Sequence, residues 1–199
     1  MKTKKTIWIP VAIGFGFGIL AFFASTANFS IPLGNDAFIG IGEIFATLSA
    51  ALGGPIATII MLVVTYGSAV AVNIELYTDA QTFYIALADF SAHLCAMLVV
   101  AICYYKLLYP KARKTSVFLV GWWLIVGVYY YLALLPLSVI LLNLANPSFG
   151  FTYASFARDF LPEFLGTATI TTLVWFAAPV RYRHPQWIEP KDAPNQSSK

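Results

Sequence analysis

Charged residues are scarce in this chain: Asp, Glu, Lys and Arg make up 11% of its 199 residues, against about 25% in an ordinary soluble domain. Hydrophobic residues make up 59%, and the mean hydropathy is +0.76. A soluble domain of this size could not bury so much apolar surface. The composition therefore excludes a soluble enzyme, a nucleic-acid-binding domain and a disordered chain, and it predicts an integral membrane protein.

Short catalytic signatures are missing as well. The sequence has no Walker motif, no His-Glu-x-x-His and no Gly-x-Ser-x-Gly. Its two cysteines, Cys95 and Cys103, lie about 12 Å apart along one helix, too far for a disulfide. We therefore do not expect an enzyme, a bound cofactor, a metal site or a nucleic-acid partner.

Six apolar stretches are long enough to be membrane helices, which need about 20 mostly apolar residues. They cover approximately residues 7–24, 37–52, 55–73, 82–105, 116–142 and 160–178. Gly53-Gly54-Pro55 predicts a tight turn between the second and third, and Pro136 predicts a kink in the fifth. We predict an all-α bundle of six transmembrane helices in residues 1–180, followed by a short polar cytoplasmic tail, 181–199.

Lysine and arginine form three clusters around these spans. The clusters are Lys2, Lys4 and Lys5; Lys106, Lys111, Arg113 and Lys114; and Arg181 and Arg183. Six spans put all three on one side, which the positive-inside rule makes the cytoplasmic side. We therefore expect a multi-pass protein of the cell membrane with both termini cytoplasmic. A signal peptide cleaved near Ala24 is the alternative interpretation of the first span, and it would leave five spans.

Four ionisable residues lie within the predicted spans: Glu43, Asp89, His93 and Glu163. Each charge costs about 2.5–3.5 kcal/mol at a helix centre, so such residues tend to face the bundle interior. All four fall between the outer surface and the midplane, which predicts one cavity open to the outside and closed below. Asp89 and His93 are four residues apart and share a helix face. Either they form an internal pair, or they bind a ligand or metal.

The outer half carries seven acids and one fixed cation, Arg158. Three consecutive tyrosines, 129–131, lie midway along the fifth span, and the last outer loop is both polar and aromatic. Acids and aromatic faces together favour a cationic organic solute. The candidate substrate-binding residues are Glu43, Asn73, Glu75, Asp89, His93, Tyr130, Asn146, Arg158 and Glu163.

Small residues recur in the first span, at Ala12, Gly14, Gly16 and Gly18. Such spacing lets helices approach closely. It indicates either packing inside the monomer or a docking face for a partner membrane protein. On the docking interpretation we predict that Gly14 and Gly18 lie on an exposed face.

These features together resemble the substrate-binding S component of energy-coupling-factor (ECF) transporters. The stretch from Ile31-Pro32-Leu33-Gly34 through Leu52-Gly53-Gly54-Pro55 is similar to the loop, second span and turn of that family. Its first-span motif is Ala-x-x-x-Ala, where this chain has Ala12 and Gly16. The resemblance implies a subunit that binds a vitamin or metal ion outside and passes it to a membrane coupling protein with two ATPase subunits.

The same Gly-Gly-Pro stretch resembles the five-span sensor domain of LytS-type histidine kinases, whose cytosolic signalling domains have no counterpart here. We therefore expect a solute-binding subunit for uptake of a small, cationic, vitamin-like molecule. A membrane sensory or structural module that signals through a partner is the alternative. A membrane enzyme would need the four intramembrane ionisable groups to converge as acid, base or metal ligands.

Overall fold

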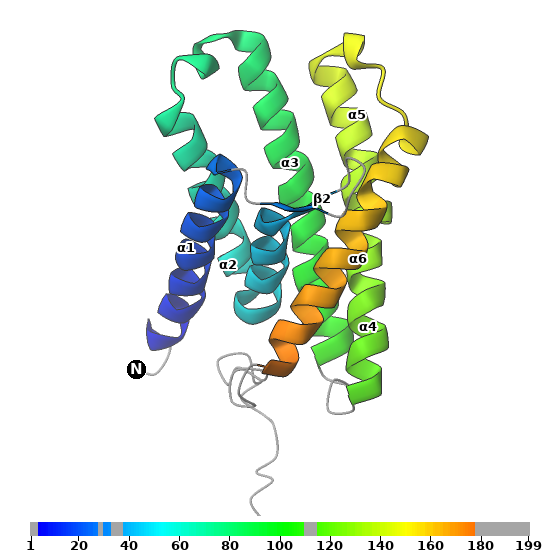
Figure 1. The fold of residues 1–199 in the computed structure, drawn as a ribbon. Helices are drawn as coiled ribbons and strands as arrows, with labels where there is room; N and C mark the ends of the chain where they lie inside the picture. Colours follow the sequence, from blue (N-terminus) through cyan, green and yellow to red (C-terminus); the bar gives the residue numbers. More distant parts are fainter. Residues whose placement is uncertain (1–3, 28–29, 33–37, 110–114, 178–199) are drawn as a thin grey trace, which may run out of the picture.

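The computed structural model describes residues 4–27, 30–32, 38–109 and 115–177, so the predicted tail lies outside the described residues. In chain order the elements are α1 (Lys4–Thr26), β1 (Ser30–Pro32), β2 (Phe38–Gly40), α2 (Ile41–Val72), η1 (Leu76–Thr78), α3 (Ala80–Cys103), η2 (Tyr104–Leu108), α4 (Thr115–Gly127), η4 (Val128–Leu134), α5 (Leu135–Ala145), η5 (Pro147–Phe149) and α6 (Tyr153–Ala177). The long helices form one bundle, in which α1 begins and α6 ends at the same end (Figure 1).

Five helices of the described chain are long and apolar enough to cross a membrane. They are Ile7–Thr26, Ile41–Val72, Ala80–Leu108, Thr115–Ala145 and Phe160–Ala177. Large apolar side chains also cover the outside of the bundle; Leu124 and Leu132, for example, are 65% and 71% exposed. Together these features indicate a membrane-embedded protein. The structure has five such helices where the sequence predicts six, because the second and third spans form the single element α2.

A sharp reversal divides α2 at Gly54, which has φ 71° and ψ −163°. Only glycine adopts this conformation readily, and Pro55 follows as a residue suited to starting a helix. Glu43 and Tyr66 both contact His93, although 23 residues of straight helix would hold them about 35 Å apart. The chain therefore turns back on itself at Gly54, where the sequence predicts a turn. The first arm, 41–53, is about 20 Å long and shorter than the hydrocarbon core of a bilayer.

A two-stranded antiparallel ribbon precedes α2, where the ECF resemblance implies a loop. Ser30 pairs with Gly40, Ile31 with Ile39 and Pro32 with Phe38. Figure 1 shows β2 among the helices, between α1 and α6. The ribbon delays the start of the helix to Ile41, while the predicted start at residue 37 lies outside the described residues.

The span Thr115–Ala145 contains a π-helical segment, η4, just before Pro136. Proline has no backbone N–H to donate and clashes with the carbonyl four residues earlier. A wider turn relieves this clash, because hydrogen bonds then reach back five residues, as from the Leu135 N–H to the Tyr130 carbonyl. The kink predicted at Pro136 thus takes the form of a π segment, and that segment carries all three consecutive tyrosines.

Helix α1 packs against the second arm of α2 through Gly14 and Gly18. A Cβ on Gly14 would lie 2.9 Å from the Ala57 Cα, and one on Gly18 would lie 2.7 Å from the Val64 Cβ. The prediction that Gly14 and Gly18 are exposed is therefore wrong: they allow two helices of the same chain to approach closely. Ala12 and Gly16 are exposed, and nothing lies within 4 Å of a Cβ built on Gly16.

Replacing Gly54 with alanine should destabilise the bundle by about 1–3 kcal/mol, because alanine is strained at this φ and ψ. The new Cβ would also lie 2.9 Å from the Tyr105 ring. Thermal unfolding in detergent, followed by tryptophan fluorescence, measures the effect. Gly67→Ala is the control, because that helical glycine has open space around it and should be neutral or slightly stabilised. Equal unfolding midpoints for the two variants would contradict the account of the reversal.

The double variant Gly14→Leu with Gly18→Leu should lose the folded bundle, because each leucine would meet the backbone of α2. The matched double variant Ala12→Leu with Gly16→Leu changes the exposed side of the same helix and should stay folded. Size-exclusion chromatography and unfolding in detergent distinguish the two. A stable, monodisperse Gly14/Gly18 variant would show that these glycines are not needed for packing.

Candidate functional site

A cavity of about 610 Å³ opens among α1, α2, α3 and α5, below the loop that leads to α6. Its described lining residues are Ala21, Ser25, Gly42, Glu43, Ala46, Met61, Leu62, Thr65, Tyr66, Ala69, Tyr77, Thr82, Ile85, Ala86, Asp89, His93, Leu142, Phe149 and Phe151. Most are apolar or aromatic. Two are carboxylates, one is a histidine, and none is a lysine or an arginine.

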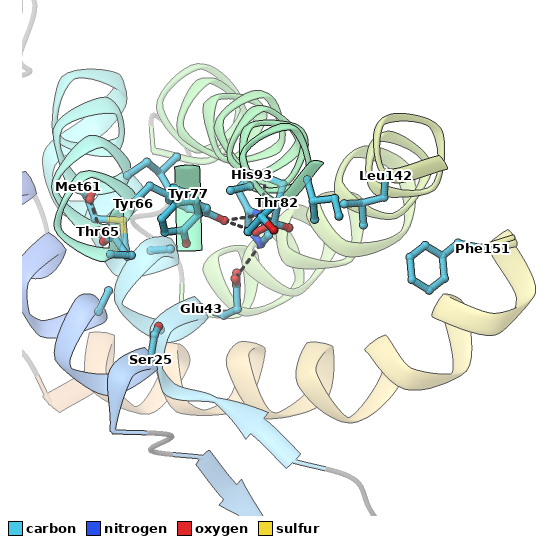
Figure 2. Close-up of a pocket in the computed structure, with 18 of the residues that line it drawn as sticks. Ser25, Glu43, Met61, Thr65, Tyr66, Tyr77, Thr82, His93, Leu142 and Phe151 are labelled. Carbon is cyan, nitrogen blue, oxygen red and sulfur yellow. Dashed lines mark hydrogen bonds and ion pairs between the residues drawn. The ribbon is translucent and has the colours of Figure 1, made fainter. Parts of the chain in front are cut away.

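His93 lies at the centre of the polar part of the cavity. Its Nε2 is 3.1 Å from Oε1 of Glu43, and its Nδ1 is 3.4 Å from Oδ1 of Asp89. Nδ1 is also 2.9 Å from the Asp89 carbonyl oxygen, one helical turn earlier. Figure 2 shows Glu43 reaching up to His93 while Tyr66 approaches from the other arm of α2. The reversal at Gly54 is what allows one helix to contact the imidazole from two directions.

Two tyrosines hold the carboxylates. The Tyr66 hydroxyl donates to Oδ2 of Asp89 at 2.5 Å, and the Tyr129 hydroxyl donates to Oε2 of Glu43 at 2.5 Å. Each acid therefore has one oxygen facing His93 and the other bound by a phenol. Hydrogen bonds to charged acceptors are the short, strong ones, so the two acids and the ring are fixed relative to one another.

The structure brings together three of the four intramembrane ionisable residues, Glu43, Asp89 and His93. The fourth, Glu163 of α6, approaches them without lining the cavity. A Cβ on Gly40 would lie 3.5 Å from Oε1 of Glu163 and 3.9 Å from Cγ of Glu43, so the two acids flank Gly40 at the end of β2. The convergence expected from their common depth is confirmed for the first three.

The other predicted binding residues are not among the residues that line the cavity. Tyr130 is buried against α6, with its hydroxyl 3.0 Å from Oγ1 of Thr167. Asn146 caps η5 by accepting from the Ser148 N–H at 3.1 Å. Asn73 ends α2, where its Nδ2 donates to the Ala69 carbonyl. Asparagines at helix ends usually serve such caps.

Glu75 and Arg158 are exposed side chains in the described structure. Glu75 precedes η1 in the connection between α2 and α3, and Arg158 lies near the start of α6. A charge outside the apolar spans needs no buried partner, because water solvates it. Neither is among the described residues that line the cavity.

Tyr66 and Tyr129, which bind the carboxylates of Asp89 and Glu43, are not among the binding residues predicted from the sequence. Tyr66 is the one tyrosine of the span 55–73, and a buried phenol needs a hydrogen-bond partner, which was the available signal. Tyr129 and Tyr130 could not be distinguished by such an argument, since both are fully buried. Their directions depend on the π segment, which turns Tyr129 toward Glu43 and Tyr130 toward α6.

The rim of the cavity is built partly by the start of α3. Asp79 caps that helix, accepting from the N–H and the hydroxyl of Thr82 at 2.8 Å each. These hydrogen bonds lower the pKa of Asp79 below its ordinary value, the backbone bond most strongly. The cap fixes Thr82 at the cavity lining, four helical residues before Ala86.

An aromatic layer closes the opposite end of the bundle. Phe118 stacks on Trp175 with ring centroids 3.6 Å apart, and Tyr104 meets Trp122 edge to face at 5.6 Å. The Trp122 indole donates to Oγ1 of Thr171 at 2.8 Å. All four rings are buried. The cavity therefore opens at the end opposite the start of α1 and has a packed floor.

Within the part of the chain that the structure describes, no group of three or more His, Cys, Asp or Glu has an arrangement that could hold a metal ion. Asp89 and His93 do form the internal pair that the sequence allows. The other polar groups of the cavity are carboxylates and hydroxyls set among apolar and aromatic side chains. No protein-family model matches the chain, and neither a curated protein nor a solved structure shows significant similarity to it.

Proposed function

We propose that this protein is a membrane-embedded solute-binding subunit that takes up a small organic cation from outside the cell and works with a separate energising module. One observation carries the proposal. An apolar and aromatic cavity of about 610 Å³ holds two fixed carboxylates, and no lysine or arginine is among its described lining residues. The volume lies within the range of about 300–1,000 Å³ that small-molecule sites occupy.

The walls fit an amine-bearing or aromatic solute. Phe149 and Phe151 lie at the outer side, with ring centroids 4.9 Å apart, and Tyr66 and Tyr77 line the facing wall. Aromatic faces attract cations most strongly where water is excluded. Glu43 and Asp89 would then supply the full negative charge at the inner end.

Six crossings with both termini in the cytoplasm are part of the proposal. The two arms of α2 count as two passes, the first of them short. The start of α1 and the end of α6 lie at one end of the bundle (Figure 1), and the positive-inside rule makes the end with the basic clusters cytoplasmic. The cavity then faces outward.

The energising module would be a membrane coupling protein with ATPase subunits, as in the ECF resemblance. Of the predicted docking residues, only Ala12 and Gly16 remain candidates, because Gly14 and Gly18 pack internally. Small exposed residues on a membrane helix permit close approach of a second helix.

Cysteine labelling tests the orientation. In a background with Cys95→Ala and Cys103→Ala, a cysteine at Ser148 should react with a membrane-impermeant maleimide added to intact cells. A cysteine at Lys111 should react only after the membrane is permeabilised. The reverse pattern would refute the outward-facing cavity.

Ligand binding tests the function. Mass spectrometry of molecules released from the purified protein should yield a cationic small molecule. Titration in nanodiscs should show binding of benzyltrimethylammonium, choline or benzylamine, and none of phenylacetate. Glu43→Gln and Asp89→Asn should each weaken cation binding at least about tenfold, equivalent to 1.4 kcal/mol.

Glu75→Gln is the matched control, because it removes an exposed outer acid that does not line the cavity. Its affinity should equal that of the unmodified protein. Binding of an anion, or equal affinities in the Glu43, Asp89 and Glu75 variants, would show that the carboxylates only hold the bundle together.

A further inference from the structure

We infer that the cavity exchanges its solute for a proton: His93 is held as an imidazolium between Glu43 and Asp89 in the empty site, and binding of one monovalent cation releases one proton outward. The inference rests on the proposed function, and it adds the charge of the solute and the stoichiometry of binding.

The hydrogen-bond partners of His93 point to a ring protonated on both nitrogens. Nε2 faces a carboxylate oxygen of Glu43 at 3.1 Å. Nδ1 faces the Asp89 carbonyl oxygen at 2.9 Å, where only a donor makes a hydrogen bond. A neutral imidazole has one donor nitrogen and one acceptor nitrogen, so one of these contacts would then lack a proton. The proton between Nε2 and Glu43 could instead be bonded to the carboxylate oxygen, and the site would hold the same number of protons.

The other groups around the His93 ring do not change the number of protons in the site. The Tyr66 hydroxyl lies 3.2 Å from Nδ1, but it already donates to Asp89. Tyr129 donates to Glu43 from η4. Glu163 of α6 lies across Gly40 from Glu43 and places a further carboxyl group on that side. The facing groups from α2, α3, η4 and α6 are therefore acids, or phenols that donate to acids, and among the described residues none is a competing cation.

Competition for Glu43 makes exchange the consequence of binding, because Tyr129 occupies Oε2 and a cation must therefore share Oε1 with the Nε2–H of His93. Two carboxylates and one imidazolium leave one unit of negative charge at the centre of the cavity. A monovalent cation beside Glu43 would repel the imidazolium, which can lose its Nε2 proton to water at the open mouth. The N–H bond breaks, the ring becomes neutral, and Nδ1–H keeps its hydrogen bond to the Asp89 carbonyl. The cation takes the place of the proton beside Glu43, so the occupied cluster has the same net charge as the empty one.

Proton release makes the affinity for the cation depend on pH in one direction. Because the empty site holds one more proton than the occupied site, raising the pH favours binding. The dissociation constant should fall about tenfold per pH unit over the range, about pH 6 to 8, in which one proton is exchanged. Binding without exchange would leave the dissociation constant flat over the same range.

Calorimetry with benzyltrimethylammonium in nanodiscs tests this, because the fixed charge of that probe cannot itself release a proton. Titrations in phosphate and in Tris, which differ in ionisation enthalpy, should give about one proton released per cation bound. Whatever the change in affinity, cation binding by His93→Gln should release no proton and show no pH slope, because the glutamine side chain carries no exchangeable proton of this kind. Glu75→Gln should behave as the unmodified protein.

Nitrogen-15 NMR of histidine-labelled protein is the measurement that does not depend on how His93→Gln folds. His184 is the only other histidine in the sequence, and His184→Gln removes its signal. The remaining resonance should be that of an imidazolium without the cation and of an imidazole with it.

Two results would overturn the exchange. Cation binding with no proton release and a flat pH profile would remove it while leaving the solute-binding proposal intact. Full proton release by a folded His93→Gln variant would move the proton from the histidine to a carboxyl. If neither benzyltrimethylammonium nor the other cations bind, the proposed function fails, and the exchange fails with it.

Discussion

The need to pair charged groups inside an apolar bundle governs this structure. Glu43 and Asp89 would each be costly if buried alone. His93 lies between them and contacts both, and a tyrosine hydroxyl satisfies the far oxygen of each acid. Because these side chains come from α2, α3 and η4, the polar cluster fixes how those three segments pack, as well as what the cavity can bind.

Two departures from regular helix make that pairing possible. The reversal at Gly54 folds α2 into two arms, so that Glu43 from one arm and Tyr66 from the other meet the same ring. The π segment before Pro136 turns Tyr129 toward Glu43 and leaves Tyr130 for Thr167. In both cases backbone irregularity is located where a polar side chain must be aimed, as is common at π segments near functional sites.

The sequence predicted the parts of the fold that depend on local composition. Span boundaries follow hydrophobic length, the turn follows Gly53-Gly54-Pro55, and the Asp89–His93 pair follows helical spacing. It could not determine which side of α1 packs inward. Residues two apart on a helix point about 200° away from each other, so Gly14 and Gly18 form one small face and Ala12 and Gly16 another. Only the approach of Ala57 and Val64 decides between the two faces.

The roles of polar residues at helix ends do not follow from the sequence, for a related reason. An asparagine there can cap a helix or bind a ligand, and Asn73 and Asn146 make caps. The three-residue strands are also too short to show a period-two pattern. The choice between Tyr129 and Tyr130 depends on the one extra residue that a π turn contains, which no composition argument detects. The sequence indicates how far along a span a residue lies. It does not indicate which way the side chain points, because tertiary contacts set that direction.

The packed floor of the cavity constrains any uptake by this chain. Below His93 the interior is filled by residues such as Met97, Tyr104 and Trp122, all essentially inaccessible. A solute that enters through the mouth of the cavity has no continuous path to the other end of the bundle, and a proton displaced from the site leaves by the same mouth. Binding alone therefore moves nothing across the membrane. Delivery would require the helices around the aromatic layer to separate, which breaks contacts such as Phe118–Trp175 and exposes apolar surface within the bundle. In the proposed function, the separate energising module supplies that work, while this chain supplies the binding site.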